Sequence, residues 1–265
     1  MGGATVLYLV PYSMLTPQVV VRLAEAGVSA TAGSIYGLTP FVLIPAMSVI
    51  TPNILHRIGM KFAHLTGLIV AALALLATSA LLVTGFVALP TYVALAALLG
   101  IASALTWTAT EAMIATHAPA DRIGSFTAIY QTGLGTSLAV GPFVPALFSM
   151  TDMGLAMSTT ILMGFAVTLA AVSTLQVSPA AEITASAPAG RVVWRGVVML
   201  LAVALVGGWF EVGLNAILPY IALKTGLSSD KAAMSVGAPA TGALLSQLPI
   251  FFLADRFTST AQYRV

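Results

Sequence analysis

Eight long apolar blocks make up most of the chain, and short stretches with charged and turn-forming residues separate them. The first six cover about residues 5–21, 32–55, 62–83, 91–116, 123–150 and 155–175; the seventh follows Arg191 and Arg195 and ends near Tyr220, and the eighth covers 232–253. A helix needs about 20 residues to cross a bilayer, whereas a barrel strand takes about ten with alternating polarity. The pattern therefore predicts an all-α membrane protein, a polytopic bundle of spanning helices.

Composition excludes the soluble classes of protein. Apolar residues make up 59% of the 265 residues and charged residues 7%, whereas a soluble domain has about 25% charged residues. The chain has no cysteine, which excludes disulfides and thiolate metal sites. The blocks are rich in glycine, alanine, serine and threonine, which let membrane helices pack closely. No basic residue precedes the first block, so we expect that block to be a membrane helix rather than a cleaved signal.

One polar stretch divides the chain. Residues 176–190 read QVSPAAEITASAPAG, which is a linker composition. We therefore expect a six-helix bundle over residues 1–175, a cytoplasmic linker over 176–192, the start of a second bundle over 193–254 and a cytoplasmic tail over 255–265.

The positions of lysine and arginine predict the orientation. With a cytoplasmic N-terminus, the inside loops hold seven of these residues and the outside loops three. The inside set is Arg57, Lys61, Arg122, Arg191, Arg195, Arg256 and Arg264, and the outside set is Arg22, Lys224 and Lys231. Because cytoplasmic loops carry the excess of basic residues, both termini are expected inside. The expected location is a plasma membrane, of the bacterial inner-membrane kind.

Two acidic residues lie inside apolar blocks. Glu111 lies towards the end of the fourth block and Glu211 lies within the seventh. Ionisable groups are expensive inside a membrane and are functional candidates by default. A carboxyl group in a low-dielectric environment can exchange protons near neutral pH, which suits proton coupling. A structural role for Glu111 also stays open, in which it pairs with Arg122 or with a helix end.

Polar and aromatic side chains recur in the middle of the blocks. Tyr8 and Tyr12 are four residues apart and so share one helix face. Two interpretations fit such residues: they line a central cavity, or they form hydrogen bonds between helices. The set comprises Tyr8, Tyr12, Gln18, Thr106, Trp107, Tyr130, Gln131, Trp209, Asn215 and Gln247.

No catalytic pattern accompanies these residues. His56, His64 and His117 fall near the ends of blocks without the spacing of a metal site. The sequence has neither a phosphate-binding loop nor a nucleophile elbow. We therefore expect no metal, no cofactor and no enzymatic activity, and the net charge of +2 gives no indication of nucleic-acid binding.

Two charged turns carry a family resemblance. The loop after the second block reads NILHRIGMKF, with Arg57, Gly59 and Lys61 spaced as R-x-G-x-K. This resembles the cytoplasmic loop between helices 2 and 3 of the major facilitator superfamily, although His56 and Met60 depart from the usual Asp and Arg. The stretch PIFFLADRF repeats part of the motif after the eighth block, with Asp255 and Arg256 as its D-R pair.

Further segments agree with this resemblance. The stretch from Glu111 to Tyr130 looks like the loop that joins helices 4 and 5 in that family, with Arg122 and Gly124 in its turn. The segment GLGTSLAVGP is similar to the helix-5 motif of its drug/proton antiporters, with a soft, closely packed face formed by Gly133, Gly135, Gly141 and Pro142. Pro145 and Ala146 replace the glycine pair of that motif.

The resemblance implies a monomeric secondary active transporter, which moves a small organic solute by alternating access and is driven by a proton gradient. The candidate cavity residues are Tyr12, Gln18, Glu111, Tyr130, Gln131, Trp209, Glu211 and Asn215. The cytoplasmic gate is expected at Arg57, Gly59, Lys61, Asp255 and Arg256, and the helix-5 motif at Gly135, Gly141 and Pro142. Such transporters bind their substrate near the bilayer midplane, between two repeats.

The resemblance also implies twelve helices, of which the chain supplies eight. Residues 257–265 no longer follow the motif, so a transporter cut short after its eighth helix is expected. A truncated or degenerate membrane protein without transport activity is the alternative. A membrane-embedded enzyme is a third possibility, for which the sequence offers no catalytic constellation.

Overall fold

The computed structural model describes residues 2–119, 122–176, 202 and 213–246, and this part of the chain is helical without strands. The helices are α1 (Gly2–Glu25), α2 (Ala30–Ser48), α3 (Thr51–Ile58), α4 (Met60–Thr84), α5 (Leu89–His117), α6 (Ile123–Val140), η1 (Gly141–Phe143), α7 (Val144–Leu147), α8 (Asp152–Gln176) and α10 (Ser229–Met234). Residues 213–224 and 237–246 are also helical. The all-α membrane fold expected from the sequence is confirmed.

Five helices are long and apolar enough to cross a membrane: Gly2–Glu25, Ala30–Ser48, Met60–Thr84, Leu89–His117 and Asp152–Thr174. Two of the first six predicted blocks are interrupted. The block at 32–55 divides into α2 and α3, and the block at 123–150 divides into α6, η1 and α7. Proline explains both breaks, because Pro52, Pro142 and Pro145 provide no backbone N–H for a continuing helix.

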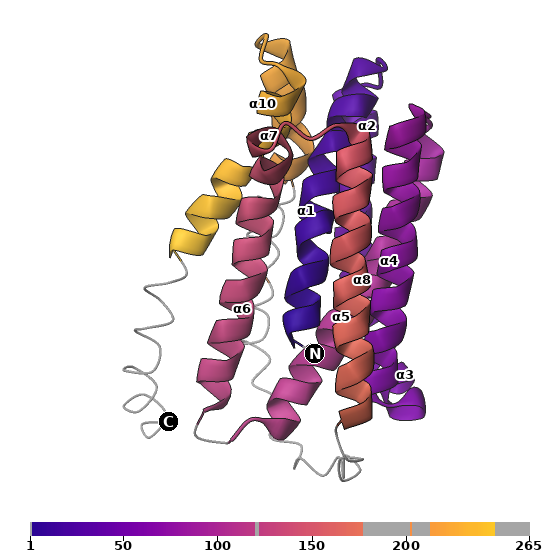
Figure 1. The fold of residues 1–265 in the computed structure, drawn as a ribbon, viewed down its shortest axis with the longest axis vertical. Helices are drawn as coiled ribbons and strands as arrows, with labels where there is room; N and C mark the ends of the chain where they lie inside the picture. Colours follow the sequence, from indigo (N-terminus) through magenta and orange to yellow (C-terminus); the bar gives the residue numbers. More distant parts are fainter. Residues whose placement is uncertain (1, 120–121, 177–201, 203–212, 247–265) are drawn as a thin grey trace.

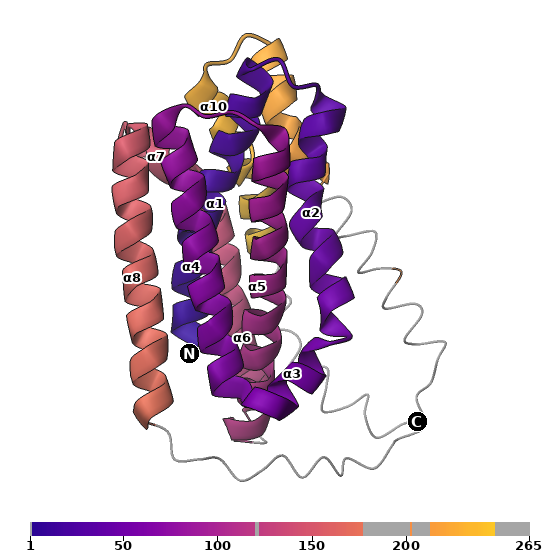
Figure 2. The same ribbon diagram turned by 90° about the vertical axis from the view of Figure 1, so that its right-hand side faces the viewer.

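The helices run up and down between two ends of the bundle (Figures 1 and 2). We call the end with Gly2, α3 and residues 117–119 and 122–123 the lower end. The upper end holds residues 25–30, 85–88, 148–152 and 225–228. At the upper end α4 stops at Gly85, whose φ of 67° is left-handed. The backbone N–H of Phe86 then donates to the carbonyl of Leu81, which closes the helix end.

Helix α1 lies at the centre of the bundle. It contacts α2, α4, α5, α6, η1, α8 and α10. Its side chains Tyr8, Leu15, Val19 and Leu23 are fully buried. The helix continues through Pro11 and Pro17 without interruption. Every cavity described below has α1 in its wall, so this helix positions the candidate site.

Small residues bring the helices close together, as the composition predicts. Gly100 of α5 faces α2, where an added Cβ would stand 2.9 Å from the carbonyl oxygen of Pro40. Gly67 of α4 faces α5, where an added Cβ would stand 2.9 Å from the carbonyl oxygen of Ala102. No side chain other than hydrogen fits at either position without moving a helix backbone.

The outer face of α8 has the composition expected of a lipid-facing surface. Exposed apolar side chains recur along it at helical spacing, from one end to the other. They are Met153, Met157, Ile161, Phe165, Leu169 and Val172, each more than 40% exposed. A stripe of this length on one helix face fits contact with the hydrocarbon interior of a bilayer.

Candidate functional site

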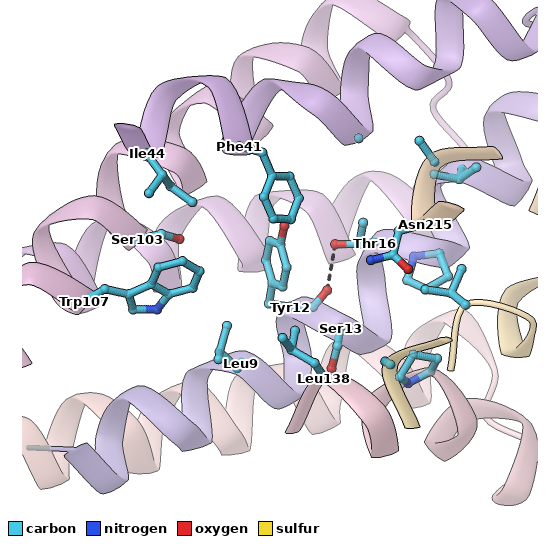
Figure 3. A pocket seen from close by; sticks show the side chains of 17 residues that line it. Leu9, Tyr12, Ser13, Thr16, Phe41, Ile44, Ser103, Trp107, Leu138 and Asn215 are labelled. Carbon is cyan, nitrogen blue, oxygen red and sulfur yellow. Dashed lines mark hydrogen bonds between the residues drawn. The ribbon is translucent and has the colours of Figure 1, made fainter. Parts of the chain in front are cut away.

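A narrow cavity of about 70 Å³ lies beside α1 in the upper part of the bundle. Helices α1, α2, α5 and α6 form most of its wall, and η1 and segments of residues 213–246 complete it. Figure 3 shows the labelled side chains Tyr12, Phe41, Ser103, Trp107 and Asn215 around it. Residues from both predicted bundles therefore meet at one cavity.

A second cavity of about 350 Å³ adjoins the first on the side of the lower end. The two share wall residues from α1, α2, α5, α6 and the helical segment 237–246: Leu9, Phe41, Trp107, Leu138 and Ala240. Glu111, Gln131 and Gly135 line only the lower cavity. The paired cavities thus extend from Asn215 near the upper end to Glu111 towards the lower end.

Glu111 is an exposed side chain one helical turn from Trp107 on the same face of α5. Within the described residues, no ion pair or hydrogen bond is seen for its carboxylate. A structural role in which Glu111 pairs with Arg122 or with a helix end stays a prediction. Its carboxylate is positioned to interact with whatever occupies the lower cavity.

Hydrogen bonds hold α1 against α5 and α6. The hydroxyl groups of Tyr8 and Ser103 lie 2.5 Å apart in the core between α1 and α5. Ser13 donates to the carbonyl of Ser137 at 2.8 Å, and Ser137 donates to the carbonyl of Val6 at 2.9 Å. Gly141 makes room for this contact, since a Cβ there would overlap the Ser13 side chain. These contacts join α1 to both α5 and α6 beside the cavity.

A second polar cluster lies deeper, between α1, α4 and α5. Thr5 shares hydrogen bonds of 3.0 Å with the Nε2 atom of His64 and with the hydroxyl of Thr110. His64 is fully buried, and its Nδ1 atom has no hydrogen-bond partner among the described residues. The sequence indicated only that His64 lies near a block end, because an apolar helix gives no sign of which face is buried.

The upper end carries charged contacts around a polar cavity of about 370 Å³. Arg22 at the end of α1 pairs with Asp152 at the start of α8. Ser229 at the start of α10 donates to the carboxylate of Glu25. Gln18, a predicted cavity residue, lines this upper-end cavity rather than the two below it. These contacts link α1 to both predicted bundles at one end.

The predicted gate residues Arg57, Gly59 and Lys61 lie at the lower end, where α3 meets α4. Gly59 connects the two helices with φ 82° and ψ 150°, a conformation that side chains disfavour. This requirement explains the glycine in the motif. Asp255 and Arg256, the other half of the expected gate, lie outside the described residues.

The structure distributes the other predicted site residues over several places. Tyr12, Asn215 and Pro142 line the upper cavity, and Gln131 and Gly135 line the lower one. Tyr130 lines neither cavity: it is buried beside Gly2, and its hydroxyl has no hydrogen-bond partner within the described part of the chain. Trp209 and Glu211 fall outside the described residues. Among the wall residues that sequence reasoning missed, Phe41 carried no signal, because it looks like any lipid-facing aromatic residue.

These features define a multi-pass membrane protein with a cavity between two groups of helices. The family model of the Major Facilitator Superfamily matches residues 1–265, so the chain belongs to the Major Facilitator Superfamily. The membership predicted from the charged turns is thereby confirmed. It supports a secondary transporter rather than an enzyme.

The fold is similar to the crystal structure of a D-xylose-proton symporter, with a TM-score of 0.62 and 14% sequence identity. The alignment covers 97% of this chain and 69% of the symporter chain. At this identity the likeness shows the fold alone. A comparison with curated protein sequences gives no match.

Proposed function

We propose that the protein is a secondary active transporter that moves a small organic solute by alternating access, with protons as the coupling ion. The main observation in support is the pair of cavities beside α1. Residues of the helical segments 213–224 and 237–246 form part of their walls. Two groups of helices that meet around a cavity can rock against each other and open it to one side at a time.

Close contacts between the two groups support closure at the upper end. Gly33 and Gly37 of α2 face residues 213–224: a Cβ on Gly33 would overlap the ring of Tyr220, and one on Gly37 would stand 3.0 Å from the Cβ of Ala216. A Cβ on Gly237 would overlap the ring of Phe143. In this proposal, these contacts and the hydrogen bond between Glu25 and Ser229 keep the two helix groups together at the upper side. Transport requires them to separate in the other half of the cycle.

The lower end provides the alternate gate in this proposal. Arg57, Gly59 and Lys61 approach the Asp255–Arg256 turn when the lower side closes, and separate from it when the lower side opens. The basic residues of the loops support a cytoplasmic position for this end and for both termini. We further propose that the protein is a monomer in a bacterial inner membrane. Its six-helix bundle covers residues 1–175, and a cytoplasmic linker covers residues 176–192.

Proton coupling is assigned to the two membrane acids. Glu111 lies at the lower cavity without a described partner, and the sequence places Glu211 in the seventh predicted span. A carboxyl group that binds a proton on one side and releases it on the other links the proton gradient to the conformational cycle. Glutamine keeps the shape of the side chain but cannot ionise, so Glu211→Gln tests the coupling role.

The test uses the full chain reconstituted in vesicles that contain a pH-sensitive dye. Solutes are added outside, beginning with D-xylose and the lipophilic cation tetraphenylphosphonium, and proton movement is followed with and without an ionophore. We expect solute-dependent proton movement that Glu211→Gln abolishes, while Glu182→Gln in the predicted linker leaves it unchanged. Equal coupling in the Glu211→Gln protein would remove that residue from the mechanism, and no solute-dependent flux over a broad panel would contradict the proposed function.

A further inference from the structure

We propose that the ligand of the paired cavities is an organic cation with a broad apolar body, and that Glu111 supplies its counter-charge. This inference rests on the proposed transport function and assigns the substrate class of the same site. Three properties of the cavity wall support it. The surface is mainly apolar, the serine and threonine hydroxyl groups already form hydrogen bonds within the protein, and the charged side chain of Glu111 lines the lower cavity.

The wall of the paired cavities is mainly aliphatic and aromatic. Leu9 from α1, Phe41 from α2, Trp107 from α5 and Leu138 from α6 face both cavities. The lower cavity, at about 350 Å³, lies within the range of roughly 300–1,000 Å³ that small-molecule sites occupy. Such a surface stabilises a ligand by removing apolar area from water.

The serine and threonine hydroxyl groups in the wall are already engaged within the protein. Ser13 donates to the carbonyl groups of Val10 and Ser137, and Thr16 donates to the carbonyl of Tyr12. Ser103 shares its hydrogen bond with Tyr8. Besides Glu111, the polar groups that the described wall offers a ligand are the side chains of Tyr12, Gln131 and Asn215 and the indole N–H of Trp107, which has no described partner. A ligand with more hydroxyl groups than these can bind, such as a sugar, is disfavoured, since each unpaired polar group costs about 1–3 kcal/mol.

Glu111 provides the charge that completes this chemistry. Among the described residues that line the two cavities, Glu111 is the one charged side chain. It makes no ion pair or hydrogen bond with another described residue, unlike Arg22, Asp152 and Glu25 at the upper end. A carboxylate beside an apolar cavity attracts a cation and repels an anion.

The neighbour of Glu111 on the helix favours the same ligand. Trp107 lies one turn away on the same face of α5 and lines both cavities (Figure 3). The face of an indole ring attracts a positive charge, so Trp107 and Glu111 can act on one cationic group. An apolar body then occupies the space between Phe41, Leu9 and Leu138. The geometry points to a ligand that combines a delocalised or quaternary cation with aromatic or alkyl groups.

Equilibrium binding to the full chain in nanodiscs tests this assignment, with empty nanodiscs as the background for partition into lipid. Radiolabelled tetraphenylphosphonium is the probe, and tetraphenylborate has the same shape with the opposite charge. We expect saturable binding of the cation, competition by unlabelled cation, and no saturable binding of the borate or of D-xylose. Saturable binding of the anion, or no saturable binding of the cation, would overturn the assignment.

Two substitutions locate the binding. Glu111→Gln is expected to weaken tetraphenylphosphonium binding at least tenfold, with partial recovery in Glu111→Asp, whereas the linker control Glu182→Gln leaves it unchanged. Trp107→Leu is expected to weaken tetraphenylphosphonium binding about fivefold. This variant tests the location of the site if the Glu111→Gln protein does not fold. Unchanged affinity in correctly folded Glu111→Gln protein, or in Trp107→Leu, would overturn the proposed site.

The outcomes also separate this inference from the proposed function. Proton-coupled transport of D-xylose or another neutral solute, without saturable cation binding, would refute the substrate class and leave the transporter intact. Saturable cation binding that depends on Glu111, without any solute-driven proton flux, would refute the transport function and leave the binding site intact.

Discussion

Replacing Gly37 by valine is expected to hold the cavity open at the upper end. A Cβ at this position would stand 3.0 Å from the Cβ of Ala216 and 3.5 Å from its Cα, and the two γ-methyl groups of valine reach further. Because Ala216 belongs to the helical segment 213–224, the backbone of that segment has to move away from α2. The strain falls only on the state in which the two helices touch.

The size of the effect follows from known costs of overpacking. Extra methyl groups in a well-packed contact cost about 1–3 kcal/mol. Since the upper-open state is free of this strain, the ratio of open to closed molecules should rise by about 5- to 150-fold. Gly164→Val in α8 is a matched control, because a Cβ there meets no atom within 4 Å. Ala216→Gly should restore closure in the Gly37→Val protein.

Cysteine labelling measures this shift directly, since the natural chain has no cysteine. Asn215→Cys places a single thiol in the upper cavity, and a membrane-impermeant maleimide is added to one side of sealed vesicles at a time. Gly37→Val should speed labelling from the upper side at least fivefold, and Gly164→Val should not. Unchanged labelling in a folded, monodisperse Gly37→Val protein would refute the idea that contact between α2 and residues 213–224 closes the cavity.

Three further predictions concern particular contacts. His64→Leu should change the free energy of unfolding by less than about 1 kcal/mol, measured by thermal unfolding. The reason is that Thr5 keeps its hydrogen bond to Thr110 and the unpaired Nδ1 atom is removed. His64→Ala should instead lower the free energy of unfolding by about 2–4 kcal/mol, because it leaves a cavity. A loss above 2 kcal/mol in His64→Leu would show that the imidazole itself stabilises the cluster. Gly59→Ala should destabilise the protein by roughly 1–2 kcal/mol because of its φ of 82°, and an equal effect of Gly164→Ala would contradict this reason. Arg22→Ala should lower the free energy of unfolding by less than about 1 kcal/mol, because the side chains of Arg22 and Asp152 are both about 40% exposed. A larger loss of stability that persists in high salt would contradict the assignment of this ion pair as a weak surface pair.

The sequence predicted the helices well because charged residues are scarce and mark the ends of the spans. It missed the breaks after Ser48 and Val140, where the apolar run continues and proline alone signals the change. Pro11 and Pro17 show why that signal is ambiguous, since α1 passes through both. Proline in an apolar run therefore indicates a possible break without locating it.

The candidate cavity could be predicted only in part, and the reason is geometric. Tyr12, Glu111, Gln131 and Asn215 were identified because they are polar or charged within apolar blocks, and they line the paired cavities. Thr106 has the same polarity but donates to the carbonyl of Ala102 in its own helix. In a helix that is apolar on all sides, periodicity does not show which face meets a cavity and which meets lipid. Phe41 was missed for this reason, and so was the burial of His64 in the separate polar cluster.

The distance between the two helix groups at the upper end tests the central claim most directly. Spin labels at Glu25→Cys and Ser229→Cys, in the otherwise cysteine-free chain, report on a contact that the structure shows closed. Alternating access predicts two distance populations by pulsed electron paramagnetic resonance, one short and one longer, whose ratio shifts with pH and with added tetraphenylphosphonium. A single short distance under all these conditions would contradict the account.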